Sequence, residues 1–264
     1  MQHPVEPNQN LYFMPDVPHL VKNLKSAIIS GHIITIPLLA PLVEKEQLIS
    51  SEVSVAPLKD LVSFQENMAL KMAPNLSRGV LEPSHFEKMK VSSAMHVFSK
   101  STSAALRYMV EKERIPESFL TTSWFLGKMD HWFELMLSRY VVTALSHFKM
   151  EEYEKAISFL RDSIHLFQGL KIGPRGSWKP VQTGLLMATT ILEVQQDLLR
   201  QGNKFVLTCR FTQDCLEIVF LHTSEEPCPN TCGVSLRTTG CLCRAVPRGV
   251  DSSHVTWTRV RLES

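Results

Sequence analysis

The sequence predicts a mixed α/β protein that is mostly helical, and three observations support this. Apolar residues recur at helical spacing from about residue 56 to about residue 200. Two short apolar runs of strand-like character, residues 11–14 and 204–210, flank this helical region. Each run is followed within a few residues by an acidic side chain, Asp16 after the first and Asp214 after the second. We therefore expect a small core with strands, interrupted by a large helical insertion.

The first run, Leu11–Met14, is expected to be a buried strand that delivers Asp16 at its C-terminal end. Pro18 suits the first turn of a helix, where its missing N–H costs nothing. Apolar residues at helical spacing follow, so a helix is predicted over about 18–30. Gly31 is expected to end it.

The rest of the chain divides into helices separated by turn residues. Residues 31–55 contain β-branched runs and two prolines, and they favour no single element. Thr212 is a plausible helix N-cap after the second strand-like run. Weak periodicity predicts irregular structure over 221–264. The helices are expected over about 56–74, 84–112, 121–147, 151–168 and 181–200, with a loop rich in Gly and Pro over 169–180.

Composition indicates an ordinary globular chain. Of the 264 residues, 44% are hydrophobic and 20% are charged, which is close to the average for soluble proteins. A net charge of +2 is too weak to indicate nucleic-acid binding by itself. The most apolar stretch, 33–43, is interrupted by Pro37 and Pro41 and is shorter than the roughly 18 residues of a membrane span. We expect a soluble intracellular protein with no membrane partner.

Cysteines are concentrated near the C-terminus. Their spacing there is C-x3-C-x8-C-x-C, whereas zinc knuckles favour tighter pairs such as C-x2-C. A zinc site is therefore not predicted. The four residues are Cys228, Cys232, Cys241 and Cys243.

Several motifs together resemble one protein family. Residues 16–23 read DVPHLVKN, residues 69–76 read ALKMAPNL and residues 211–217 read FTQDCLE. The content, order and spacing of these motifs resemble those of P-element-type transposases, the THAP-domain-associated family. The resemblance covers roughly residues 10–220. The resemblance implies a partial RNase H-like core interrupted by an all-α insertion domain. The implied division is 1–50 for the N-terminal core remnant and connector, 51–200 for the insertion, 201–220 for the C-terminal core remnant and 221–264 for a divergent tail.

The resemblance implies metal-dependent cleavage and transfer of DNA strands at transposon ends, in the nucleus. Carboxylates would hold Mg²⁺ or Mn²⁺, because hard cations prefer charged oxygen ligands. By motif match Asp16 and Glu217 are the expected catalytic and metal-binding residues. The family's first catalytic Asp lies on an earlier strand, and no counterpart precedes Asp16. We therefore expect a catalytically incomplete transposase fragment, so enzyme activity is left open.

The resemblance also implies a GTP site in the insertion domain, although no G-x-x-x-x-G-K-S/T phosphate loop occurs. By motif match Lys71 is expected to contact phosphate and Asp130 to read guanine. Asp214 is a third expected contact. Six residues before Lys71, where the family pattern has an acidic residue, this chain has Gln65.

Simpler interpretations of the same residues stay open. Asp16 could be a helix N-cap and His19 a structural hydrogen-bonding residue. The others could be ordinary surface or first-turn charges, namely Lys71, Asp130, Asp214 and Glu217. At the level of the whole chain, the alternative is a non-catalytic, domesticated regulator that binds full-length transposase. A helical scaffold unrelated to transposition is a third hypothesis, but it leaves the order of the acidic motifs unexplained.

Overall fold

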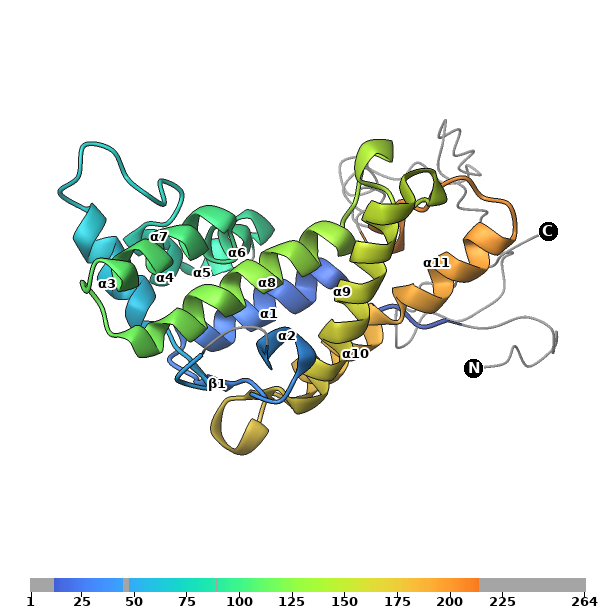
Figure 1. Ribbon diagram of the computed structural model, residues 1–264. Coiled ribbons are helices and arrows are strands. Elements are labelled where there is room, and N and C mark those ends of the chain that lie inside the picture. Colours follow the sequence, from blue (N-terminus) through green and yellow to red (C-terminus); the bar gives the residue numbers. More distant parts are fainter. Residues whose placement is uncertain (1–11, 45–47, 89, 214–264) are drawn as a thin grey trace, which may run out of the picture.

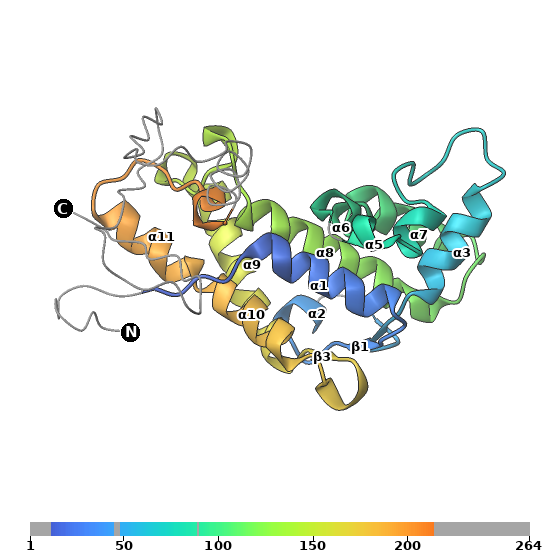
Figure 2. The ribbon, with the colours of Figure 1, turned by 180° about the vertical axis from the view of Figure 1, so that it is seen from behind.

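The structure is a computed structural model, and it describes residues 12–44, 48–88 and 90–213. Two long helices, α1 (Val17–Ile29) and α8 (Leu120–Met136), run side by side through the middle of the molecule. The shorter helices α3–α7 lie at one end of this pair and α9–α11 at the other, as Figures 1 and 2 show from opposite sides. The predicted Asp214 and Glu217, and the four cysteines of the tail, lie outside the described residues.

The helices at the first end are short. They are α3 (Ala56–Gln65), α4 (Arg78–Leu81), α5 (His85–Lys88), α6 (Val91–Val97) and α7 (Lys100–Glu111). A 3₁₀ turn, Glu117–Phe119, connects α7 to α8, and the two helices pack as an antiparallel pair. The other end holds α2 (Pro41–Glu44), α9 (Met150–Gly169), α10 (Lys179–Thr189) and α11 (Ile191–Arg200).

One small antiparallel sheet occurs in the part of the chain that the structure describes. Its central strand β1 (Ile34–Thr35) pairs with β2 (Glu52–Val53) on one side and with β3 (Lys171–Ile172) on the other. The side chains of Ile34, Val53 and Ile172 meet in register and are buried. The mostly helical prediction is therefore confirmed, whereas three two-residue strands do not confirm an RNase H-like core.

The first predicted strand is wrong over its described part, because Tyr12–Pro15 forms no strand. The helix predicted after it is confirmed as α1. Asp16 caps its start by accepting a hydrogen bond from the His19 backbone N–H at 3.0 Å. Gly31 follows its end with φ of +83°, a conformation that suits glycine.

Four predicted helices are shorter or broken, and hydrogen bonds from polar side chains accompany several of the breaks. The helix over 84–112 is three helices, and Ser99 caps the third by accepting from the Thr102 N–H at 3.2 Å. The helix over 181–200 divides at Thr190, whose hydroxyl donates to the Met187 carbonyl at 2.6 Å. The helix over 56–74 ends at Gln65.

Contacts with the chain's later residues end the helix predicted over 121–147. It stops at Met136, and the following Ser138 N–H donates to the Thr208 hydroxyl at 2.9 Å. The same hydroxyl donates to the Leu135 carbonyl at 2.7 Å. The strand expected over 204–210 reduces to a single antiparallel bridge between Val206 and Leu145, followed by a 3₁₀ turn at Thr208–Phe211. None of the helices in the described ranges is long and apolar enough to cross a membrane.

Candidate functional site

The first acidic motif contacts the described part of the second, although the two are far apart in sequence. The backbone N–H of Gln213 donates to Asp16 Oδ1 at 3.0 Å, across 197 positions of sequence. Asp16 Oδ2 accepts from the His19 backbone N–H and also contacts His19 Nδ1. The Asp16 side chain is only 7% exposed to solvent. Gln213, the last described residue of the second motif, is thus held against the start of α1.

These contacts engage both oxygens of the Asp16 carboxylate. A metal ligand needs a free lone pair, and each carboxylate oxygen carries two. Within the described ranges, however, no group of three His, Cys, Asp or Glu side chains converges to hold a metal ion. The described residues therefore do not supply a metal site, and the expected partner Glu217 lies outside them. The role of Asp16 that the structure does show is helix capping and motif pairing.

Lys71 lies on the long loop between α3 and α4, and its side chain is exposed. Gln65, at the end of α3, holds this loop with three hydrogen bonds. Its Nε2 donates to the carbonyls of Ala73 at 3.1 Å and Leu76 at 2.8 Å, and its Oε1 accepts from the Ala73 N–H at 3.1 Å. A carboxylate here could not donate to the two carbonyls. The amide at this position therefore fixes the loop that carries Lys71.

Asp130 lies in the second half of α8 and is 7% exposed. Among the described residues, no donor lies within hydrogen-bonding distance of its carboxylate. Burial, with a smaller contribution from Glu134, raises the pKa of Asp130 from 3.8 to about 6, and Lys100 opposes this rise. Burial therefore disfavours the charged form of Asp130, although its oxygens are not among the fully enclosed, unpartnered side-chain atoms of the described residues.

The charges around Asp130 are arranged across two helices. Lys100, at the start of α7, bridges both carboxylate oxygens of Glu134 at 2.7 and 2.8 Å. Glu134 lies one helical turn after Asp130 on the same face of α8. His131 Nδ1 is 3.8 Å from Glu134, and the His131 ring packs against that of Phe159 of α9 at 4.4 Å between centroids. Asp130 therefore lies beside a neutralised ion pair that leaves its own acceptors free.

A cavity of about 910 Å³ opens next to this cluster. His131 and Glu134 form part of its wall, and the rest comes from the segment after α8 and the start of α9. Several apolar side chains of that segment are exposed, including Tyr140 at 72% and Val142 at 75%. The cavity is large enough for a drug-sized ligand, for which about 300–1,000 Å³ is typical.

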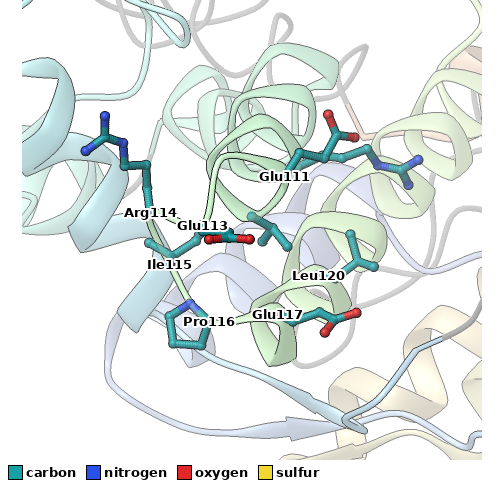
Figure 3. Close-up of a pocket in the computed structure, with 9 residues that line it drawn as sticks. Glu111, Glu113, Arg114, Ile115, Pro116, Glu117 and Leu120 are labelled. Carbon is teal, nitrogen blue, oxygen red and sulfur yellow. The ribbon is translucent and has the colours of Figure 1, made fainter.

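A second cavity, of about 780 Å³, lies at the turn between α7 and α8. Figure 3 shows the carboxylates of Glu111, Glu113 and Glu117 around the apolar side chains of Ile115 and Leu120. Arg107 and Arg114 also line it, so its charges are mixed, and neither Lys71 nor Asp130 is part of its wall. The 910 Å³ cavity borders the ion pair next to Asp130 through His131 and Glu134, but Asp130 and Lys71 do not line this cavity either.

The structure does not join Lys71 to Asp130 through any hydrogen bond or ion pair within the described ranges. Sequence analysis missed Lys100 and Glu134. The spacing of Asp130 and Glu134, four residues apart on one helix, was a signal that could have found Glu134. Lys100 had no such signal, because it lies 30 positions earlier and reaches the site only through the packing of α7 on α8.

Comparison with known proteins defines the class of this helical unit. Residues 42–162 match the family model described as a TNP-like, GTP-binding insertion domain. This range includes Lys71, Asp130, Lys100 and Glu134. Residues 42–162 are thus similar to the GTP-binding insertion domains of this family.

One solved structure has a similar fold. The chain is similar to a chain of the Drosophila P element transposase strand transfer complex, with a TM-score of 0.68 and 16% sequence identity. The likeness covers 85% of this chain and 49% of the other, so this chain spans about half the length of that transposase. No curated protein sequence matches. Domain match and fold together confirm the predicted resemblance to P-element-type transposases.

Proposed function

We propose that this chain binds GTP and that Asp130 reads the guanine. The observation that carries the proposal is the buried Asp130 carboxylate, which no described donor satisfies, inside a matched GTP-binding domain. A carboxylate can accept from the guanine N1–H and the exocyclic amine together, and adenine offers no such pair of donors. The guanine would supply the hydrogen bonds that the folded chain leaves out.

Lys71 is the proposed phosphate contact. Its exposed ammonium acts as a point charge, and Gln65 fixes the loop that presents it. A loop held by three hydrogen bonds orders little further on binding, which reduces the entropic cost. Asp214 is retained as a third proposed contact; it follows Gln213, which is bonded to Asp16.

Calorimetry with GTP and ATP tests this proposal. The chain is expected to bind GTP in preference to ATP, and Asp130→Asn and Lys71→Ala are expected to abolish or strongly weaken binding. Exposed residues of matched charge provide the controls, Asp60→Asn and Lys59→Ala. Equal affinity for ATP and GTP would refute the guanine role. Unchanged GTP affinity in Lys71→Ala would remove Lys71 from the site.

A second proposed function is a non-catalytic regulator related to transposases, and the Asp16 contacts favour it. One oxygen of that carboxylate accepts from the His19 N–H of α1 and the other from the Gln213 N–H. We propose that the chain binds DNA at transposon ends and associates with full-length transposase in the nucleus without completing strand cleavage. Incubation with end-containing DNA and Mg²⁺ or Mn²⁺ tests this. Metal-dependent cleavage that is lost in Asp16→Ala would instead assign the chain a catalytic role.

A further inference from the structure

A short loop between β3 and α10 carries an isolated group of positive charges. Lys171, Arg175 and Lys179 lie within nine residues, and all three side chains are exposed. No Asp or Glu occurs between Asp162 and Glu193. Within the described ranges, none of the three cations forms an ion pair. Their charge is therefore not neutralised by neighbours.

Hydrogen bonds close this loop and fix where its charges lie. The Trp178 N–H donates to the Ile172 carbonyl at 3.1 Å, so the two ends of the loop meet. Lys171 and Lys179 consequently flank the base of the loop, and Arg175 lies near its tip. The Gly173 N–H donates to the Ile33 carbonyl at 3.0 Å, which ties the loop to the sheet. In Figures 1 and 2 the loop projects from one edge of the molecule, beyond β1 and β3.

The backbone of Arg175 is strained. Its φ of +54° and ψ of +22° lie in the left-handed region, which side chains other than glycine adopt rarely. Glycine would fit better and already occupies the neighbouring left-handed position, Gly176, with φ of +72°. Glu113 shares this φ of +54°, so the strain alone assigns no role to Arg175, and the part of Arg175 in a contact rests on its exposed charge.

The charge on other elements near the loop is sparse. Through the sheet, Lys171 pairs with Thr35, and Thr35 pairs with Glu52 on the far strand, so an acidic residue lies two strands away. His32 packs its ring against Trp178 at 5.5 Å between centroids, and this contact occupies the half-buried indole. Among the apolar side chains of the loop, Pro174 is exposed, Trp178 is half-buried and Ile172 is buried, so the exposed part of the loop is mainly cationic.

We propose that the loop of residues 171–179 binds the phosphate backbone of double-stranded nucleic acid. A duplex presents one negative charge per about 1.7 Å of axis, so closely spaced unpaired cations gain by releasing its condensed counterions. A rigid loop keeps the three cations clustered and loses little freedom on binding. The contact recognises phosphate, so it is independent of base sequence. It lies outside the matched GTP-binding range, 42–162.

Fluorescence anisotropy with a short labelled DNA duplex of arbitrary sequence, over a series of salt concentrations, tests the proposal on the full chain. The test variant combines Lys171→Gln, Arg175→Gln and Lys179→Gln. The control variant makes the same change of charge at exposed lysines elsewhere, with Lys59→Gln, Lys112→Gln and Lys204→Gln. We expect the slope of log K against log salt concentration to become shallower by up to about 2.7 in the test variant alone, at about 0.9 per phosphate contact.

Two results would overturn the proposal. One is an equal loss of DNA binding in both variants, which would reflect net charge alone. The other is unchanged DNA binding in the test variant together with loss of binding to vesicles of phosphatidylserine and phosphatidylcholine, which would assign the loop to a membrane surface. Measuring GTP binding and thermal unfolding on the same samples separates this proposal from that of the nucleotide site.

The single variant Arg175→Gly distinguishes a loss of DNA binding from a loss of folding. Because glycine relieves the left-handed strain, we expect this variant to melt at the same or a higher temperature than the parent chain while its DNA affinity falls. Full DNA affinity in Arg175→Gly would exclude Arg175 from the contact.

Discussion

Replacing Asp130 by Asn is expected to make the protein more stable at neutral pH and unable to select GTP. Asp130 is buried, and its pKa is raised from 3.8 to about 6, first by burial and then by Glu134. A raised folded-state pKa means that folding favours the protonated form. The stability that this group contributes is therefore fully present below the unfolded-state pKa and is lost as the pH rises through about 6.

The size of the effect follows from the two pKa values. The difference between 3.8 and about 6 corresponds to about 3 kcal/mol, at about 1.4 kcal/mol for each pKa unit. Proton linkage predicts that the parent chain loses about 2 kcal/mol of this stability as the pH rises from about 4.5 to about 7.5. An asparagine does not titrate, so the stability of Asp130→Asn relative to the parent chain should rise by that amount over this range.

Urea unfolding of the parent chain and of Asp130→Asn at several pH values measures this difference. Asp60→Asn provides the control for a carboxylate that is exposed, and its profile should stay parallel to the parent profile. Parallel profiles for Asp130→Asn as well would refute the raised pKa of Asp130. GTP titrations on the same samples should show binding by the parent chain that weakens below about pH 6, where Asp130 gains its proton.

Four further outcomes follow from single contacts. Lys100→Ala removes the cation that lowers the Asp130 pKa, so the pH midpoint of GTP binding, measured by calorimetry, should move upward. Gln65→Glu deprives two buried carbonyls of their donor and should cost about 3 kcal/mol in urea unfolding; an unchanged midpoint would contradict the Gln65 clamp. Gly169→Ala places a Cβ at 2.5 Å from the rigid Pro37 ring and should cost about 1–3 kcal/mol, whereas Gly79→Ala, with 3.8 Å of room, should be neutral. Asp16→Ala should cost about 1 kcal/mol through the lost cap, read as a lower melting temperature.

Local signals were enough to predict α1 and its cap. Asp16, Pro18 and Gly31 each act within a few residues of their own position, so their effect can be read from the sequence. The end of α8 could not be predicted in the same way. It depends on Thr208, which bonds to Ser138 and Leu135 across about 70 positions, and no periodicity in residues 121–147 records that contact.

The candidate site likewise has features that the sequence predicts and features that only the fold provides. Lys71 and Asp130 were predicted from motifs, but motifs carry no information on burial. The raised pKa of Asp130 arises from the packing of α8 and from the placement of Lys100, which only the fold provides. Gln65 departs from the family's GTP pattern, and the structure explains why an amide is favourable at this position. Its amide makes three hydrogen bonds that a carboxylate could not all make.

Polar groups in this molecule differ in whether the fold satisfies them, and this difference separates structural from functional roles. Asp16 and Gln65 have partners within the chain, and each has a visible structural task. Asp130 has no donor among the described residues, and Arg175 holds a strained backbone without an ion pair. Selection tolerates such costs where an outside partner compensates for them. Trp124 is the counterexample that limits this criterion, because its buried indole N–H lacks an acceptor and nothing in the structure explains it.

For Asp130 the cost of partial desolvation appears as a pKa raised to about 6, whereas its oxygens are not among the fully enclosed atoms without a partner. Asp130 and Arg175 carry opposite charges, on α8 and on the loop before α10. The first is proposed to receive the donors of a guanine and the second the phosphates of a duplex. Removing either side chain should therefore stabilise the free protein and weaken one ligand only. A variant that lost both ligands at once would show that the two sites are coupled through the helices between them.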